Sequence, residues 1–165
     1  MTPREASLES TSTQADHPNV AVFPPALIAG AMVVGLLLHG WQPIHPLPAW
    51  PARGIGTALF VGSALVGMWG EQVMKRAGTN VRPNLPTTAI VTDGPFRYTR
   101  NPLYVSIVGL ALGVGFLVNG LWPLVVVVPA VAVLQWGVIA REERYLAAKF
   151  GEPYLAYKQR VRRWL

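Results

Sequence analysis

Four apolar segments separated by polar or proline-rich stretches dominate the pattern of the chain. They cover about residues 20–39, 54–74, 103–118 and 121–140. A helix needs roughly 20 residues to cross the hydrocarbon core of a bilayer, and the first, second and fourth segments supply that length. The third is short, because its sixteen residues at about 1.5 Å each reach only roughly 24 Å. Asn119-Gly120 predicts a tight turn between the third and fourth segments, which would make them a helical hairpin.

This pattern predicts an all-α integral membrane fold with four transmembrane helices, the last two forming a short helical hairpin. Residues 1–19 are polar and rich in Ser and Thr, which indicates a disordered N-terminal tail before a membrane domain over 20–165. After the fourth segment, apolar and basic residues interleave as in an amphipathic helix on an anionic membrane surface. We therefore expect a C-terminal amphipathic cytoplasmic helical tail, broken near Gly151 and Pro153.

Composition narrows the classes of function. Hydrophobic residues make up 52% of the chain and charged residues 13%, which is too apolar for an ordinary soluble domain. Cysteine is absent, so disulfide frameworks, thiolate metal sites and thiol catalysis are excluded. The three histidines show no spacing typical of a metal site, and we expect no metal. The net charge of +6 would suggest nucleic acid for a soluble protein, but here the basic residues flank apolar spans, so we expect a membrane and no nucleic acid.

The distribution of basic residues predicts an orientation. A four-span topology puts the N-tail, the loop at 71–102 and the tail from Arg141 on one face, with one, five and seven Lys and Arg, thirteen of the fourteen. The other face holds only Arg53, in the loop before the second span. By the positive-inside rule, both termini and the large loop are expected in the cytoplasm, at a bacterial-type inner or cell membrane. The sequence leaves the oligomeric state open.

The stretch DGPFRYTRNPLY, residues 93–104, combines charged, aromatic and turn-forming residues just before the third span. Asn101 is a favoured helix N-cap and Pro102 suits a first helical turn, so the free amides of that helix would face the interface. An anion would be stabilised there, and Arg97 and Arg100 add positive charge. The aromatic rings of this stretch suit a nucleobase or a sulfonium. The alternative is that the stretch is an ordinary aromatic and basic flank of a membrane helix.

Glu142 and Glu143 follow directly after the fourth apolar segment. Adjacent residues of a helix point about 100° apart, so we expect at least one carboxylate to face the helix bundle. It would suit ribose hydroxyls, an ammonium or a sulfonium. The alternative is that both pair with neighbouring arginines. Glu71 is expected to form a helix-end ion pair with Lys75.

The segments TTAIVTDGPFRYTRNPLYVS and REERYLAAKFGEPYLAYKQRVRRWL, with a short hairpin between them, resemble the isoprenylcysteine carboxyl methyltransferase and phospholipid methyltransferase superfamily, in a bacterial-type form. The matching part is residues 87–165, and the first two spans carry no motif. The resemblance implies a membrane-embedded methyltransferase that uses S-adenosylmethionine and a lipophilic acceptor, either isoprenylcysteine-carboxylate-like or phospholipid-like. It also implies a cofactor pocket at the cytoplasmic membrane edge.

Carried over position by position, the resemblance implies two sets of site residues. The cofactor-binding set is Thr88, Ala89, Ile90, Val91, Phe96, Asn101, Pro102, Leu103, Tyr104 and Glu142. The catalytic set is Arg100, Asn101, Glu142 and Glu143.

Three positions depart from the family pattern. Asn101 stands where the prenylcysteine branch has histidine, and Phe96 stands where many members have tyrosine. The arginine that binds the substrate carboxylate in prenylcysteine enzymes would fall near Val138, so the acceptor need not be a prenylcysteine. Two rival functions stay open. One is a membrane reductase of the sterol or isoprenoid type using NADPH, although the acid expected after its tyrosine is missing at 105–107. The other is a non-enzymatic protein that organises lipid or a partner.

Overall fold

The computed structural model describes residues 22–81 and 87–165, and within these ranges it contains helices, loops and one isolated bridge but no strand. The all-helical class predicted from the sequence is therefore confirmed, while the predicted tail at 1–19 lies outside the described residues. The elements are α2 (Pro24–Trp41), α3 (Ala49–Arg76), the 3-10 turn η1 (Gly94–Arg97), α4 (Pro102–Leu117), α5 (Leu121–Val133), the π-helical segment η2 (Leu134–Ile139), α6 (Ala140–Phe150) and α7 (Glu152–Arg160).

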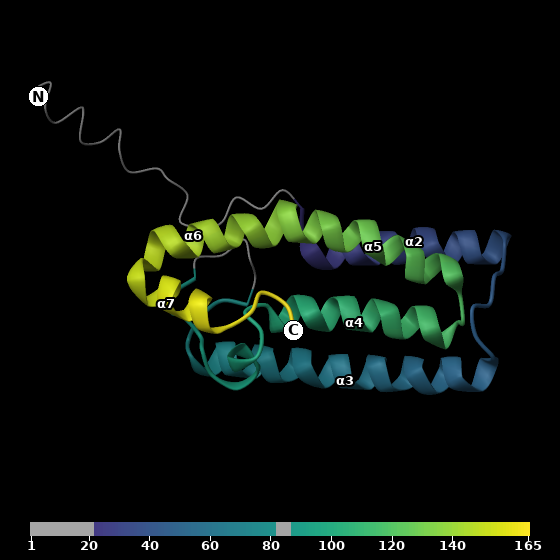
Figure 1. Cartoon of the computed structure of the whole chain (residues 1–165), viewed down its shortest axis with the longest axis horizontal. Coiled ribbons are helices and arrows are strands. Elements are labelled where there is room, and N and C mark those ends of the chain that lie inside the picture. Colours follow the sequence, from purple (N-terminus) through teal and green to yellow (C-terminus); the bar gives the residue numbers. More distant parts are fainter. Residues whose placement is uncertain (1–21, 82–86) are drawn as a thin grey trace, which may run out of the picture.

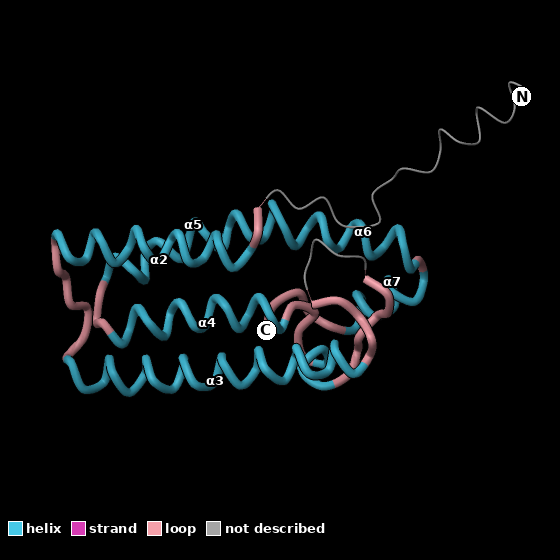
Figure 2. The backbone as a smooth tube through the Cα atoms, turned by 180° about the vertical axis from the view of Figure 1, so that it is seen from behind, coloured by secondary structure: helices cyan, strands magenta, loops and turns pink. Residues whose placement is uncertain are grey.

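Helix α4 lies between α3 on one side and the paired α2 and α5 on the other (Figure 1). Seen from behind, the order is the same, with loops joining the helices at both ends of the bundle (Figure 2). The α5–η2–α6 helix continues past the start of α4, and α7 then folds back toward that start. The chain thus has its longest loop and its C-terminal segment at one end of the bundle, and a short loop and a tight turn at the other.

Three of the described helices are long and apolar enough to cross a membrane: Pro24–Trp41, Ala49–Arg76 and the continuous Leu121–Phe150. Helix α4 is apolar but has 16 residues, as the short third segment predicted. Helix α3 begins at Ala49, earlier than the apolar pattern indicated, so Arg53 lies in the helix and not in the preceding loop. A proline at N-terminal positions of a helix is favourable, and Pro51 stands in this first turn.

Small residues bring α3 and α4 into close contact. A Cβ added at Gly113 would lie 2.8 Å from the Phe60 nitrogen, and one at Gly56 would lie 2.6 Å from the Leu117 nitrogen. The Ser106 hydroxyl of α4 donates a hydrogen bond of 2.7 Å to the Ser63 carbonyl of α3. Membrane helices associate through such close backbone approach and polar contacts. The glycines of α4 therefore serve helix packing.

The fourth apolar segment is not a regular helix. Pro129 lies inside α5, and the π-helical turn η2 follows a few residues later. Leu134, Val138 and Ile139 of this turn are fully buried. A π-turn adds a residue to the local repeat and changes the face on which all later residues lie, and such turns are frequent at functional sites. Here it precedes the two glutamates by three residues.

The predicted break in the C-terminal tail is confirmed at Gly151, whose φ of +59° ends α6 and lets α7 turn back. Helix α7 buries Tyr154 and Tyr157 against the protein. Its aromatic face packs on the bundle because the backbone bend at Gly151 directs α7 toward the start of α4.

Candidate functional site

A cavity of about 370 Å³ lies at the end of the bundle where α3 and α6 extend beyond the start of α4. This volume is within the range of small-molecule sites. Two of its walls are the two segments singled out in the sequence, the block before α4 and the start of α6. The predicted site residues that line it are Ala89, Ile90, Val91, Phe96, Arg100, Asn101, Pro102, Leu103, Tyr104, Glu142 and Glu143.

Thr88 is the predicted cofactor-binding residue that the structure does not place in this lining. Its hydroxyl donates a hydrogen bond to the Gly78 carbonyl at 2.9 Å, and its amide donates to the Thr79 hydroxyl at 3.1 Å. Thr88 therefore ties the loop to the end of α3. The neighbouring Thr87 borders the cavity in its place.

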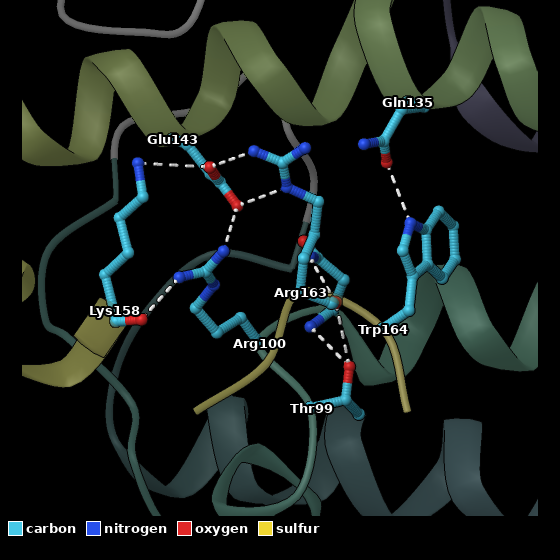
Figure 3. A network of polar contacts seen from close by, with 8 residues as sticks. Thr99, Arg100, Gln135, Glu143, Lys158, Arg163 and Trp164 are labelled. Carbon is cyan, nitrogen blue, oxygen red and sulfur yellow. Dashed lines mark hydrogen bonds and ion pairs between the residues drawn. The ribbon is translucent and has the colours of Figure 1, made fainter. Parts of the chain in front are cut away.

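Glu143 is the centre of a buried ionic cluster (Figure 3). It is 4% exposed. The Arg163 guanidinium donates two hydrogen bonds to its carboxylate, at 2.8 and 2.7 Å, and Arg100 donates one at 2.8 Å. The Lys158 ammonium lies 3.4 Å away. The carboxylate thus has three cationic partners, which offsets the large cost of burying its charge.

The Arg100 side chain is held in one orientation at the cavity wall. It is 8% exposed, and its two terminal nitrogens donate to the Glu143 carboxylate and to the Lys158 carbonyl, each at 2.8 Å. Its Nε is buried and has no hydrogen-bond partner among the described residues. A buried guanidinium N–H without an acceptor is costly, and because this atom is shielded, Arg100 contributes its positive charge to the cavity wall and not a free N–H.

Glu142 has different surroundings from its neighbour. Its carboxylate accepts a hydrogen bond of 2.8 Å from the Tyr104 hydroxyl, which comes from the first turn of α4. Both residues line the cavity. Adjacent positions on α6 thus place one carboxylate among the cations and the other against a neutral donor. The expectation that at least one of the two faces the bundle is confirmed.

Asn101 stands at the N-cap position of α4 as predicted, but its side chain does not cap the helix. Instead, its side-chain amide nitrogen donates a hydrogen bond to the Arg163 carbonyl at 2.9 Å. The first intrahelical bond runs from the Val105 amide to the Asn101 carbonyl, so the amides of Leu103 and Tyr104 precede the helical ladder. Both of these residues border the cavity, which adds the positive end of the helix dipole to its wall.

Two tyrosines of α7 close the cavity from the far side. The Tyr157 hydroxyl donates to the Phe96 carbonyl at 2.8 Å. Burial raises the pKa of Tyr157 to about 12 and raises the pKa of Tyr154 as well. Both phenols are therefore neutral hydrogen-bonding groups at ordinary pH. They come from the YLAY stretch, which the resemblance had marked without assigning a role.

The cavity also has an apolar side that the sequence did not indicate. Phe23, Pro24 and Pro25 at the start of α2 border it, as do Gly67, Glu71 and Met74 of α3. Glu71 forms the expected ion pair with Lys75, at 2.6 Å. The described residues contain no group of three or more His, Cys, Asp or Glu side chains that would hold a metal ion.

Arg163 is the main residue of the site that sequence reasoning missed. The tail holds several basic residues in similar surroundings, and nothing in their spacing distinguishes this one. The only signal was the charge of Glu143 directly after an apolar segment, which favours a cationic partner without saying which one.

Comparisons with known proteins identify a family for most of the chain. The model of a family described as phospholipid methyltransferase matches residues 52–153, more than half of the chain. Among curated proteins, an uncharacterized protein of Haemophilus influenzae (strain ATCC 51907 / DSM 11121 / KW20 / Rd) is 70% identical over 27 residues, which are 16% of this chain and 43% of that protein. The chain thus spans less than half the length of this curated relative. No solved structure matches this chain.

Proposed function

The chain belongs to the phospholipid methyltransferase family, and on that premise we propose that it is a membrane-embedded methyltransferase that uses S-adenosylmethionine and acts on a lipophilic acceptor. The observation that carries the proposal is the cavity in which the block at 89–104 and the pair Glu142 and Glu143 meet. These segments lie about 40 residues apart in the sequence, and both belong to the motif of the resemblance.

The residues of the cavity fit the groups of this cofactor. Its carboxylate suits the positive charge of Arg100 at the cavity wall and the amides at the start of α4 that precede the helical ladder. The Glu142 carboxylate suits the ribose hydroxyls or the positive sulfur. Phe96, which is buried, and the surrounding aliphatic residues suit the adenine. Cationic and anionic groups thus occupy different walls, as a ligand carrying both charges requires.

S-adenosylmethionine supplies a methyl group on a positive sulfur, and in the transfer the sulfur–carbon bond breaks as the acceptor forms its bond to that carbon. The residues of this chain contribute chiefly alignment and exclusion of water. Tyr104 holds the Glu142 carboxylate in place through its hydroxyl. A carboxylate acceptor needs no base, whereas an amine acceptor must give up a proton, for which Glu142 in the cavity wall is a candidate.

The apolar side of the cavity is the proposed acceptor side. It is formed by the start of α2 and by α3 near Met74, two elements separated by α4 in the fold. A lipophilic chain would reach the cavity from the bilayer between these helices. The motif-bearing walls stay available for the cofactor.

We propose four spans with both termini in the cytoplasm. Helix α7 and the C-terminal segment lie at the same end of the bundle as the cavity. Of the Lys and Arg residues that the structure describes, all but Arg53 belong to the segments 75–100 and 141–163 at that end. Helix α4 then acts as the short third span, with its start recessed beneath the loop. The cofactor would arrive from the cytoplasm.

The test is ligand binding by the purified full chain in detergent, measured by calorimetry with S-adenosylmethionine and with NADPH. We expect binding of the first and not of the second. Glu142→Gln should weaken S-adenosylmethionine binding about tenfold, because a charged hydrogen-bonding partner is worth roughly 1.5–3 kcal/mol. The matched control is Glu152→Gln, the same change at the exposed start of α7, which should leave binding unchanged.

Binding of NADPH alone would favour the reductase. If Glu142→Gln and Glu152→Gln change S-adenosylmethionine binding equally, Glu142 is not part of the binding site. The acceptor class is then tested by transfer of a labelled methyl group to phosphatidylethanolamine or to a farnesylated thioether acid.

A further inference from the structure

The residues after α7 form a short strap, defined here as 162–164, that lies against the block before α4. Val161 has extended backbone. The Arg100 amide donates to the Arg162 carbonyl at 2.9 Å, and Thr99 and Arg162 form an isolated parallel bridge. The strap is therefore joined to the cavity wall through the backbone, directly beside the residue whose Nε has no partner.

Arg163 connects the strap to two more elements. Its carbonyl accepts hydrogen bonds from the Thr99 hydroxyl at 3.1 Å and from the Asn101 amide at 2.9 Å. Its guanidinium donates both hydrogen bonds to Glu143 on α6. A two-point contact between planar groups restricts the rotation of the carboxylate, which a single contact does not.

Trp164 anchors the end of the strap in the membrane bundle (Figure 3). Its indole N–H donates to the Gln135 side-chain oxygen at 2.8 Å, inside the π-helical turn. The ring packs on the buried cluster of Leu134, Val138 and Ile139. The strap is thus held at three points, on the loop, on α6 and on η2.

We propose that Arg163 is a positioning residue for ligand binding, which acts through Glu143 on Arg100. Arg163 fixes the Glu143 carboxylate, and the fixed carboxylate together with the Lys158 carbonyl holds the Arg100 side chain at the cavity wall, where its positive charge favours the carboxylate of the ligand. Asn101 contributes by holding the Arg163 backbone and not by contact with a reacting atom. The inference rests on the proposed function, because it takes the cofactor as the ligand.

This role makes a prediction that a purely structural role does not. S-adenosylhomocysteine and 5′-methylthioadenosine share the adenosine and the thioether sulfur, but the second has no amino acid carboxylate. If Arg163 positions Arg100 for that carboxylate, then its loss should affect only the first compound. If Arg163 merely supports the fold of the cavity, its loss should weaken both.

The experiment measures the affinity of both compounds for the full chain in detergent by calorimetry. Arg163→Gln leaves Glu143 paired with Arg100 and Lys158, so the protein should fold. We expect this variant to lose about tenfold in affinity for S-adenosylhomocysteine and to bind 5′-methylthioadenosine as the wild type does. Arg163→Lys keeps the positive charge but loses the two-point contact, so its affinity for S-adenosylhomocysteine should lie between those of the wild type and Arg163→Gln. The matched control is Arg162→Gln, whose side chain is exposed on the same strap.

Each outcome decides between the hypotheses. Unchanged affinity for both compounds in Arg163→Gln, or equal losses for both, would overturn the positioning role while the proposed function stands. A wild type that binds neither compound would overturn the proposed function, and the inference with it.

Discussion

The two ends of the helix bundle are both closed by side chains, but by different chemistry. At the turn end, residues 39–48 and 119–122, the contacts are neutral: the Asn119 amide donates to the Leu47 carbonyl at 2.7 Å, and the Trp122 indole donates to the Gln42 carbonyl at 2.9 Å. At the cavity end, residues 87–104 and 140–164, a cluster of ion pairs joins the neutral contacts, and the segments surround a volume of about 370 Å³.

The difference shows where the molecule holds buried charge. Neutral side-chain bonds to backbone are enough to join two helices through a short loop, as the turn end demonstrates. The ionic cluster around Glu143 is more costly to bury than this purpose requires. In the proposed function, its role is to hold Arg100 at the cavity wall.

The largest effect is expected from Glu143→Ala, which removes the common partner of Arg100, Arg163 and Lys158. Because a buried cation left without its partner costs roughly 3–5 kcal/mol, the free energy of unfolding should fall by about that amount. The measurement is denaturant unfolding in mixed micelles followed by circular dichroism. A loss below about 1 kcal/mol would mean that the cluster is solvated and not a buried structural unit, contrary to the 4% exposure of Glu143.

A smaller effect is expected from Asn101→Ala. The variant removes one of two hydrogen bonds to the Arg163 carbonyl and keeps the one from Thr99, so the stability loss should be about 1 kcal/mol. If Asn101 acts only through the strap, the rate of methyl transfer at saturating cofactor should stay within about threefold of the wild type. Abolished turnover with normal cofactor binding would instead assign Asn101 a catalytic role.

Hydropathy was enough to predict the helices and the hairpin, because long apolar runs have few alternatives in a membrane. It did not predict the early start of α3, since Trp50, Pro51 and Arg53 interrupt the apolar pattern there. It did not predict the π-turn either. A segment that is apolar on all sides carries no periodicity, so the phase of the residues that follow is undetermined.

The motifs indicated both walls of the cavity but not how they are joined. Glu142 and Glu143 looked equivalent in the sequence, and the π-turn and the strap give them different partners. Nothing in the sequence distinguishes Arg163 from Arg160 or Arg162. The parallel bridge between Thr99 and Arg162 places the next residue, Arg163, within reach of Glu143 on α6. The apolar side of the cavity, at the start of α2, belongs to a segment without any motif.

The smallest effect is expected at the turn end, from Asn119→Gly. Asn119 has a φ of +51°, a backbone conformation that costs most residues energy and glycine almost none. The variant loses two side-chain hydrogen bonds with the Leu47 backbone, one of 2.7 Å to its carbonyl and a weaker one of 3.4 Å from its amide, the first worth about 1 kcal/mol, and the relief of strain offsets most of that loss. The unfolding free energy should therefore change by less than about 1 kcal/mol, and binding of S-adenosylmethionine measured by calorimetry should not change. A weaker affinity in this variant would show that the two ends are coupled through α4, and the contrast between a structural end and a ligand-binding end would then fail.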